Sequence, residues 1–152
     1  MTDEALKEFI IAQNSSIVFE EGTQWLSCVV DGNESRALLK SLRENSSTDF
    51  ETLMSLCGVD WKTHFDVVYH LMNRSRKQML VVKARITDHE NAETDTVSDF
   101  WQTAMLNERE VFDFYGIKFR GHPHLRRLFM PEEWSGFPLR KDYVDEINIV
   151  EL

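Results

Sequence analysis

Two apolar stretches separated by a short polar one constrain the fold of this chain more than any other feature. Residues 65–72 (FDVVYHLM) and 79–86 (MLVVKARI) are rich in the β-branched and aromatic residues that favour strands. The residues 73–77 between them are polar, so we expect an antiparallel hairpin with a longer loop. A sheet built on this hairpin has an apolar face that helices must cover.

The remaining pattern supplies such helices and further strands. Apolar residues at helical spacing predict helices over residues 4–13 and between Asn33 and Ser46, and a third from Ser98, as N-cap, through Phe114. Residues 24–30 read as a strand, residues 50–61 suit either a strand or a helix, and residues 88–96 read as a charged loop. The order α-β-α-β-β-β-α predicts an α+β fold: a small mixed or antiparallel sheet with helices on one face, followed by an extended irregular C-terminal arm.

The last third of the chain differs in composition. All three prolines and three of the six glycines follow residue 115, which predicts extended chain and tight turns over residues 116–144. The same segment is too apolar for a linker, so we expect it to bury side chains against a partner protein. We therefore expect an α+β domain over 1–115, with its core in 24–115, and an interaction arm over 116–152 in the same structural unit.

Charge and cysteine content exclude several classes of protein. The 152 residues include 17 Lys and Arg against 26 Asp and Glu, a net charge of −9, which argues against nucleic-acid binding. No apolar run approaches the roughly 18 residues of a membrane span, and no secretory signal is recognisable. Two cysteines cannot supply a disulfide framework or an all-cysteine metal site.

Residues with catalytic potential are few. His122 and His124 have a spacing found in some metal sites, although a proline turn is the simpler interpretation. Glu108, Glu110 and Asp113 could do acid–base chemistry, or could belong to a solvated helix end. We expect Cys57 to be a buried small hydrophobe and not a nucleophile. The isolated glycines form no phosphate-binding loop. We therefore expect no catalytic residue and no metal or cofactor site in this chain.

Three long blocks of sequence resemble one family. Residues 108–119 (EREVFDFYGIKF), 121–128 (GHPHLRRL) and 136–143 (GFPLRKDY) closely resemble, in this order, the C-type subunit of respiratory NADH:quinone oxidoreductase, the thirty-kilodalton subunit of complex I. The resemblance implies a non-catalytic structural subunit of the peripheral arm that supports the quinone-reducing module. It also implies that signature residues lie at subunit interfaces, where acids pair with basic groups of the arm or of a partner. These residues are Glu108, Arg109, Glu110, Asp113, Gly116, His122, Pro123, Arg126, Arg127, Trp134, Arg140, Lys141, Asp142 and Tyr143.

The resemblance further implies a setting for the chain. Its partners would be the quinone-cavity subunit, here called the D-type subunit, and other peripheral-arm subunits. Those partners would hold the FMN, the iron–sulfur clusters and the quinone. The chain would be peripheral, on the cytoplasmic side of the membrane or on the matrix side in a mitochondrion. Two alternatives remain: the equivalent subunit of a membrane-bound hydrogenase or ferredoxin-fed complex, or a stand-alone metal hydrolase that uses His122 and His124.

Overall fold

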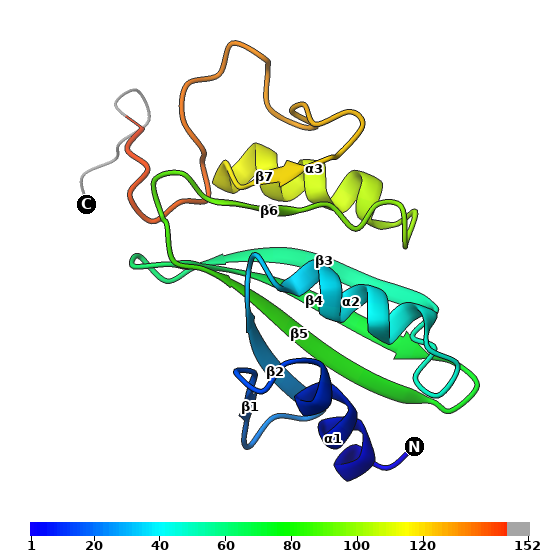
Figure 1. Cartoon of the computed structure of the whole chain (residues 1–152). Coiled ribbons are helices and arrows are strands. Elements are labelled where there is room, and N and C mark those ends of the chain that lie inside the picture. Colours follow the sequence, from blue (N-terminus) through cyan, green and yellow to red (C-terminus); the bar gives the residue numbers. More distant parts are fainter. Residues whose placement is uncertain (146–152) are drawn as a thin grey trace.

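The computed structural model describes residues 1–145 (Figure 1). Three helices and seven strands make up this part of the chain. In chain order they are α1 (Asp3–Gln13), β1 (Val18–Glu20), β2 (Leu26–Asp31), α2 (Ser35–Glu44), β3 (Thr52–Asp60), β4 (Phe65–Asn73), β5 (Gln78–Ile86), β6 (Glu93–Asp95), α3 (Ala104–Tyr115) and β7 (Lys118–Arg120). Residues 146–152, which end the predicted arm, lie outside the described residues.

The predicted hairpin is the centre of a five-stranded sheet. Strands β4 and β5 pair in antiparallel register from Phe65 opposite Ile86 to Asn73 opposite Gln78. The strand order is β1-β2-β5-β4-β3, in which β2 and β5 are parallel and the other neighbours antiparallel. The alternatives for residues 50–61 are resolved in favour of a strand, because β3 pairs along β4. The predicted α+β class with a mixed sheet is confirmed.

One face of the sheet carries the hydrophobic core. Alternate residues of β4, from Phe65 to Leu71, join the corresponding residues of β2 and β5 and the buried sides of the three helices. The helices thus cover one face, as expected. Figure 1 shows α1 and α2 lying against the sheet and α3 next to β3, the strand at one edge of the sheet. The opposite face is more polar: Arg85 pairs with Asp66 across β5 and β4 at 3.0 Å.

Three short strands, β1, β6 and β7, were not predicted. Residues 88–96 are not only a charged loop, because they contain β6, which pairs in parallel with β7 at the start of the arm. The hydroxyl of the buried Thr94 in β6 donates to the carbonyl of Gly32. The β6–β7 pairing and the Thr94–Gly32 bond join segments far apart in the sequence, so no local pattern predicts them.

The predicted start of the third helix at Ser98 is wrong, since α3 begins at Ala104. The backbone N–H of Ser98 donates to the hydroxyl of Thr96, and the indole N–H of Trp101 donates to the carbonyl of Phe50. These contacts hold residues 97–103 in turns against the core. No helix within residues 1–145 is long and apolar enough to cross a bilayer.

Candidate functional site

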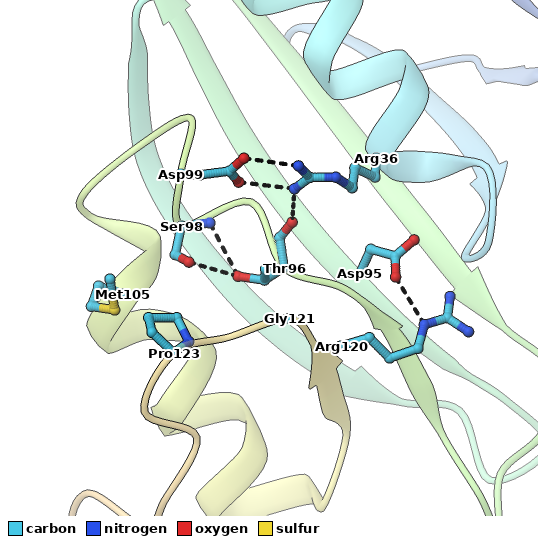
Figure 2. Close-up of a pocket in the computed structure, with 9 residues that line it drawn as sticks. All are labelled: Arg36, Asp95, Thr96, Ser98, Asp99, Met105, Arg120, Gly121 and Pro123. Atoms are coloured by element: carbon cyan, nitrogen blue, oxygen red, sulfur yellow. Dashed lines mark hydrogen bonds and ion pairs between the residues drawn. The ribbon is translucent and has the colours of Figure 1, made fainter.

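An open cavity lies between α2, the segment after β6, and β7 (Figure 2). Its volume is about 580 Å³, and Arg36 and Arg120 contribute its positive charge. Figure 2 shows both guanidinium groups turned toward carboxylates of this chain. Arg36 forms an ion pair of 2.8 Å with Asp99, and Arg120 one of 2.8 Å with Asp95. Because these cations are paired, the cavity offers no free charge that would hold an anionic substrate.

Of the two histidines at the start of the arm, His122 is held by contacts within the chain. The His122 side chain is fully buried, its Nε2 donates to the carbonyl of Met105 at 2.9 Å, and its Nδ1 accepts the His124 N–H at 3.0 Å. Both ring nitrogens therefore have partners and neither is free to bind a metal. Within residues 1–145 no group of three His, Cys, Asp or Glu side chains is placed to hold a metal ion.

Glu108 of α3 is a buried carboxyl group and not part of a solvated helix end. Its Oε1 accepts the backbone N–H of Val97 at 2.7 Å, and its Oε2 accepts the hydroxyl of Thr96 at 2.5 Å. Burial, only partly offset by these two hydrogen bonds, raises the pKa of Glu108 to about 7. Glu108 thus fastens the segment that follows β6 to α3. Glu110, in contrast, is exposed as that interpretation expected.

Asp113, one turn further along α3, fastens the arm. Its side chain is fully buried, and its Oδ2 accepts the backbone N–H groups of three successive arm residues: Leu128 at 3.1 Å, Phe129 at 2.6 Å and Met130 at 3.0 Å. Burial by itself raises the pKa of this carboxyl group. The three N–H groups and a neighbouring guanidinium outweigh that effect, so the pKa lies below its ordinary value.

The guanidinium beside Asp113 belongs to Arg127. Its Nη1 lies 3.0 Å from the Asp113 Oδ1, and the side chain is 10% exposed. Its Nη2 donates to two arm carbonyls, those of Trp134 at 3.0 Å and Gly136 at 2.8 Å. Arg127 therefore closes residues 127–136 into a loop and holds that loop on α3.

Arg109 adds a second attachment on the same helix. Its Nε and Nη2 donate to the carbonyls of Arg126 and Arg127, at 3.1 and 3.0 Å. Of the helix residues predicted to pair with the arm, Asp113 pairs with Arg127, whereas Arg109 binds backbone and Glu108 binds the segment before the helix.

The end of α3 and the end of β3 hold the far side of the arm. Gly116 ends the helix with φ of 74°, and a Cβ there would lie 2.6 Å from the Phe137 ring. Arg140 Nε donates to the Tyr115 carbonyl at 2.5 Å. The Lys141 N–H donates to the buried Asp60 carboxylate at 2.8 Å.

Comparison with known proteins places this geometry in a family. Residues 28–147 match the family described as respiratory-chain NADH dehydrogenase, 30 Kd subunit. The chain belongs to this family. It is 48% identical over 108 residues to the combined C/D subunit of NADH-quinone oxidoreductase from Phocaeicola vulgatus, covering 70% of this chain and 20% of that protein. It is 41% identical over 104 residues to the C-type subunit of NADH-quinone oxidoreductase from a Roseiflexus species, covering 66% of this chain and 59% of that protein.

A solved structure supports the same fold. A chain of the membrane-bound sulfane sulfur reductase, an archaeal respiratory membrane complex, aligns over 95% of this chain and 86% of its own length, with a TM-score of 0.78 and 28% identity. The likeness in fold therefore extends over nearly the whole chain and is not confined to the sheet. The chain spans about three fifths of the length of the Roseiflexus relative and about one fifth of the Phocaeicola protein.

The other signature residues of this 30 Kd family member lie mostly on the surface. Pro123, Arg126, Lys141 and Asp142 are exposed, and Trp134 and Tyr143 are partly buried. Arg126 and Arg127 are adjacent in the sequence, but their side chains have different surroundings in the structure. The Arg126 side chain forms no hydrogen bond or ion pair within residues 1–145, whereas Arg127 is anchored to Asp113.

Sequence reasoning missed which apolar side chains stay outside. Phe129 is 64% exposed and Leu139 is 53% exposed, although the arm that carries them is fixed to α3. The Phe129 ring stacks on Phe114, with ring centroids 5.6 Å apart. The prediction that Cys57 is buried is also wrong, because β3 leaves it exposed at the edge of the sheet. Strand pairing determines this exposure, so composition could not reveal it.

Proposed function

We propose that this chain is a non-catalytic structural subunit of the peripheral arm of an NADH:quinone oxidoreductase. In this role the arm docks on the quinone-cavity subunit, the D-type subunit. The observation that carries the proposal is the state of the arm: its charged anchors are buried on α3, while Phe129, Leu139 and Arg126 face outward. A segment fixed in this way presents a preformed surface, which lowers the entropic cost of binding.

The relatives support the choice of partner. Some of them carry the combined C/D name, and a region like this chain accounts for about one fifth of their length. A fused pair of subunits keeps the two close together, so the D-type subunit is the natural acceptor for the exposed arm. FMN, iron–sulfur clusters and quinone would then be bound by partner subunits. The chain would lie peripherally on the cytoplasmic side of the membrane, or on the matrix side in a mitochondrion.

A tagged pull-down from mildly solubilised membranes tests this proposal. We expect the D-type subunit to co-purify with flavin and iron–sulfur subunits, as identified by mass spectrometry. Arg126→Glu should lower their recovery at least about tenfold, as expected for a reversed charge opposite a complementary surface. Lys118→Glu is the matched control, because Lys118 is also exposed and unpaired within residues 1–145; its recovery should stay within about twofold. Normal recovery with Arg126→Glu would contradict docking through this surface.

A second candidate is the equivalent subunit of another respiratory membrane assembly, such as a hydrogenase or a ferredoxin-fed complex. It is favoured by the close structural match to a chain of the sulfane sulfur reductase complex. The same pull-down separates the two, because the co-purifying catalytic subunits would differ. The metal-hydrolase hypothesis has no support in the geometry, since both ring nitrogens of His122 are occupied.

A further inference from the structure

Strand β3 forms one edge of the five-stranded sheet and has an open side. Its nine residues pair with β4 only. Within residues 1–145, no other segment forms a hydrogen bond with the backbone of residues 53–59. The strand therefore presents a row of backbone N–H and C=O groups that water alone satisfies in the isolated chain.

This edge also lacks the protection that natural sheets give to exposed edges. Charged side chains, prolines and covering loops normally keep an edge strand from pairing with another chain. Residues 52–59 (TLMSLCGV) contain no charge and no proline, and a bulge between Leu53 and Ser55 is the only irregularity in the pairing. Met54 is 53% exposed and Cys57 is exposed as well. The opposite edge, β1, is only three residues long and ends at Glu20.

An apolar slot lies beside the open edge. It has a volume of about 210 Å³ and is lined by Leu56 and Gly58 of β3, Val111 and Phe114 of α3, and Leu139 of the arm. Small-molecule sites usually measure about 300–1,000 Å³, so this slot is better suited to one inserted side chain. A Cβ at Gly58 would lie 2.8 Å from the Tyr115 ring, so glycine allows α3 to approach the strand this closely.

The charge beside the slot indicates what kind of chain would bind. Glu110 lines the slot, is exposed, and forms no ion pair within residues 1–145. A basic side chain of a bound segment would complement it. A second copy of this chain is a poor occupant, because each copy carries a net charge of −9.

We propose that the β3 edge accepts an extended segment of a partner protein as a sixth strand. An apolar side chain of that segment fills the slot, and a basic side chain pairs with Glu110. Main-chain hydrogen bonds supply the affinity and the slot supplies the specificity, as in other cases of strand addition. The source of the segment, a subunit of the same membrane complex, rests on the proposed function. Its binding site rests on the geometry of the β3 edge.

The cysteine Cys57 allows occupancy of the β3 edge to be measured. Cys28 is fully buried and Cys57 is exposed at the slot, so a thiol reagent should modify Cys57 alone in the folded protein. Local desolvation, and to a lesser degree the Glu110 carboxylate, raise the pKa of the Cys57 thiol. N-ethylmaleimide labelling is therefore run at a mildly alkaline pH. The labelling rate is measured by peptide mass spectrometry for the isolated chain and for the complex recovered by the tagged pull-down.

We expect labelling of Cys57 to slow at least about tenfold in the complex, since an added strand covers the edge. Equal rates in the two samples would overturn strand addition while leaving the proposed function intact. Failure of the chain to co-purify with a membrane complex would instead overturn the proposed function and, with it, the source of the segment. A dimer of the isolated chain in light scattering, with Cys57 already protected, would assign the edge to a second copy and contradict the partner.

Two further measurements separate strand addition from general covering. In hydrogen exchange, the outward amides of residues 53–59 should exchange at least about tenfold more slowly in the complex, because only a paired backbone protects them. Cys57→Lys should reduce recovery of the complex at least about tenfold, as lysine does on protected edges. Val18→Lys is the matched control on the other edge, where the side chain is 63% exposed; its recovery should change less than about twofold. Unchanged amide exchange together with full recovery of Cys57→Lys would overturn the inference.

Discussion

The sheet and the arm of this protein are held in place by different forces. The sheet buries alternate apolar residues of β4, such as Val67 and Leu71, under three amphipathic helices. Phe119 of β7 still belongs to this core. Beyond β7, the arm leaves Phe129 and Leu139 outside and is attached to α3 through buried charged groups, Asp113 above all. Apolar burial is spread over many contacts, whereas the attachment of the arm is concentrated in a few hydrogen bonds to ionised side chains.

This difference indicates which part of the chain can unfold locally. Removing part of a shared core weakens the whole cooperative unit. Removing one member of a buried charged network costs about 3–5 kcal/mol, yet the loss falls on the segment that the network holds. The arm should therefore detach while the sheet stays folded. The predictions below test that distinction, beginning with the largest expected effect.

Asp113→Ala should release the arm. The substitution leaves three backbone N–H groups and the Arg127 guanidinium without their acceptor, at a cost of about 3–5 kcal/mol to the folded arm. We expect rapid hydrogen exchange and proteolytic cleavage over residues 122–141, with the far-UV spectrum of the sheet retained. Asp113→Asn, which keeps one acceptor oxygen but not the charge, should release the arm less completely. An arm that stays protected in Asp113→Ala would contradict the attachment described above.

Leu71→Ala should instead destabilise the whole domain. Leu71 is a fully buried core residue of β4, and truncation of such a side chain typically costs about 2–5 kcal/mol, so we expect about that loss here. Chemical denaturation should show the loss in the global transition. Leu106→Ala, at a residue of α3 that is 55% exposed, is the control and should change the free energy of unfolding by less than about 0.5 kcal/mol. A comparable loss in both variants would show that burial does not decide the effect.

The same contrast explains what the sequence could reveal. The β4–β5 hairpin, helices α1 and α2 and the α+β class follow from local apolar periodicity, which the structure keeps. The partner of Asp113 is a row of backbone N–H groups, and the β6–β7 pairing joins residues about 25 positions apart. Such contacts produce no periodic pattern of apolar residues in the sequence. Residue type indicated that Glu108 and Asp113 were unusual, but not that both were buried.

Gly116→Ala should loosen the attachment by a smaller amount. The left-handed backbone at φ of 74° costs an alanine about 1–2 kcal/mol. Its Cβ would also collide with the Phe137 ring, which the guanidinium groups of Arg127 and Arg140 both approach. Gly22→Ala is a matched control, with φ of 73° and no atom within 4 Å of the added Cβ. The difference in free energy of unfolding between the two variants isolates the Phe137 contact. Equal losses would mean that Phe137 moves aside freely.

The pH dependence of stability should separate the two buried acids of α3. The pKa of Asp113 is lowered in the folded chain, so its contribution is present above its ordinary pKa and is lost as the pH falls through the folded value. The contribution of Glu108 to stability changes with pH in the opposite direction, because burial raises its pKa from 4.5 to about 7. The stability that Glu108 contributes is complete below its unfolded pKa and is lost as the pH rises through about 7.

Glu108→Gln isolates the second effect, because the amide cannot ionise and its carbonyl still accepts the Val97 N–H. Between pH 4.5 and about pH 7 the native chain should lose stability relative to this variant, by at most about 1.4 kcal/mol per pH unit, and the difference should level off above that range. Denaturation series at each pH measure the difference. Parallel curves would show that Glu108 titrates normally despite its burial. Any loss of stability in acid that both chains share belongs to carboxylates such as Asp113, because Glu108→Gln leaves them in place. Only the difference between the two chains reports the protonation of Glu108.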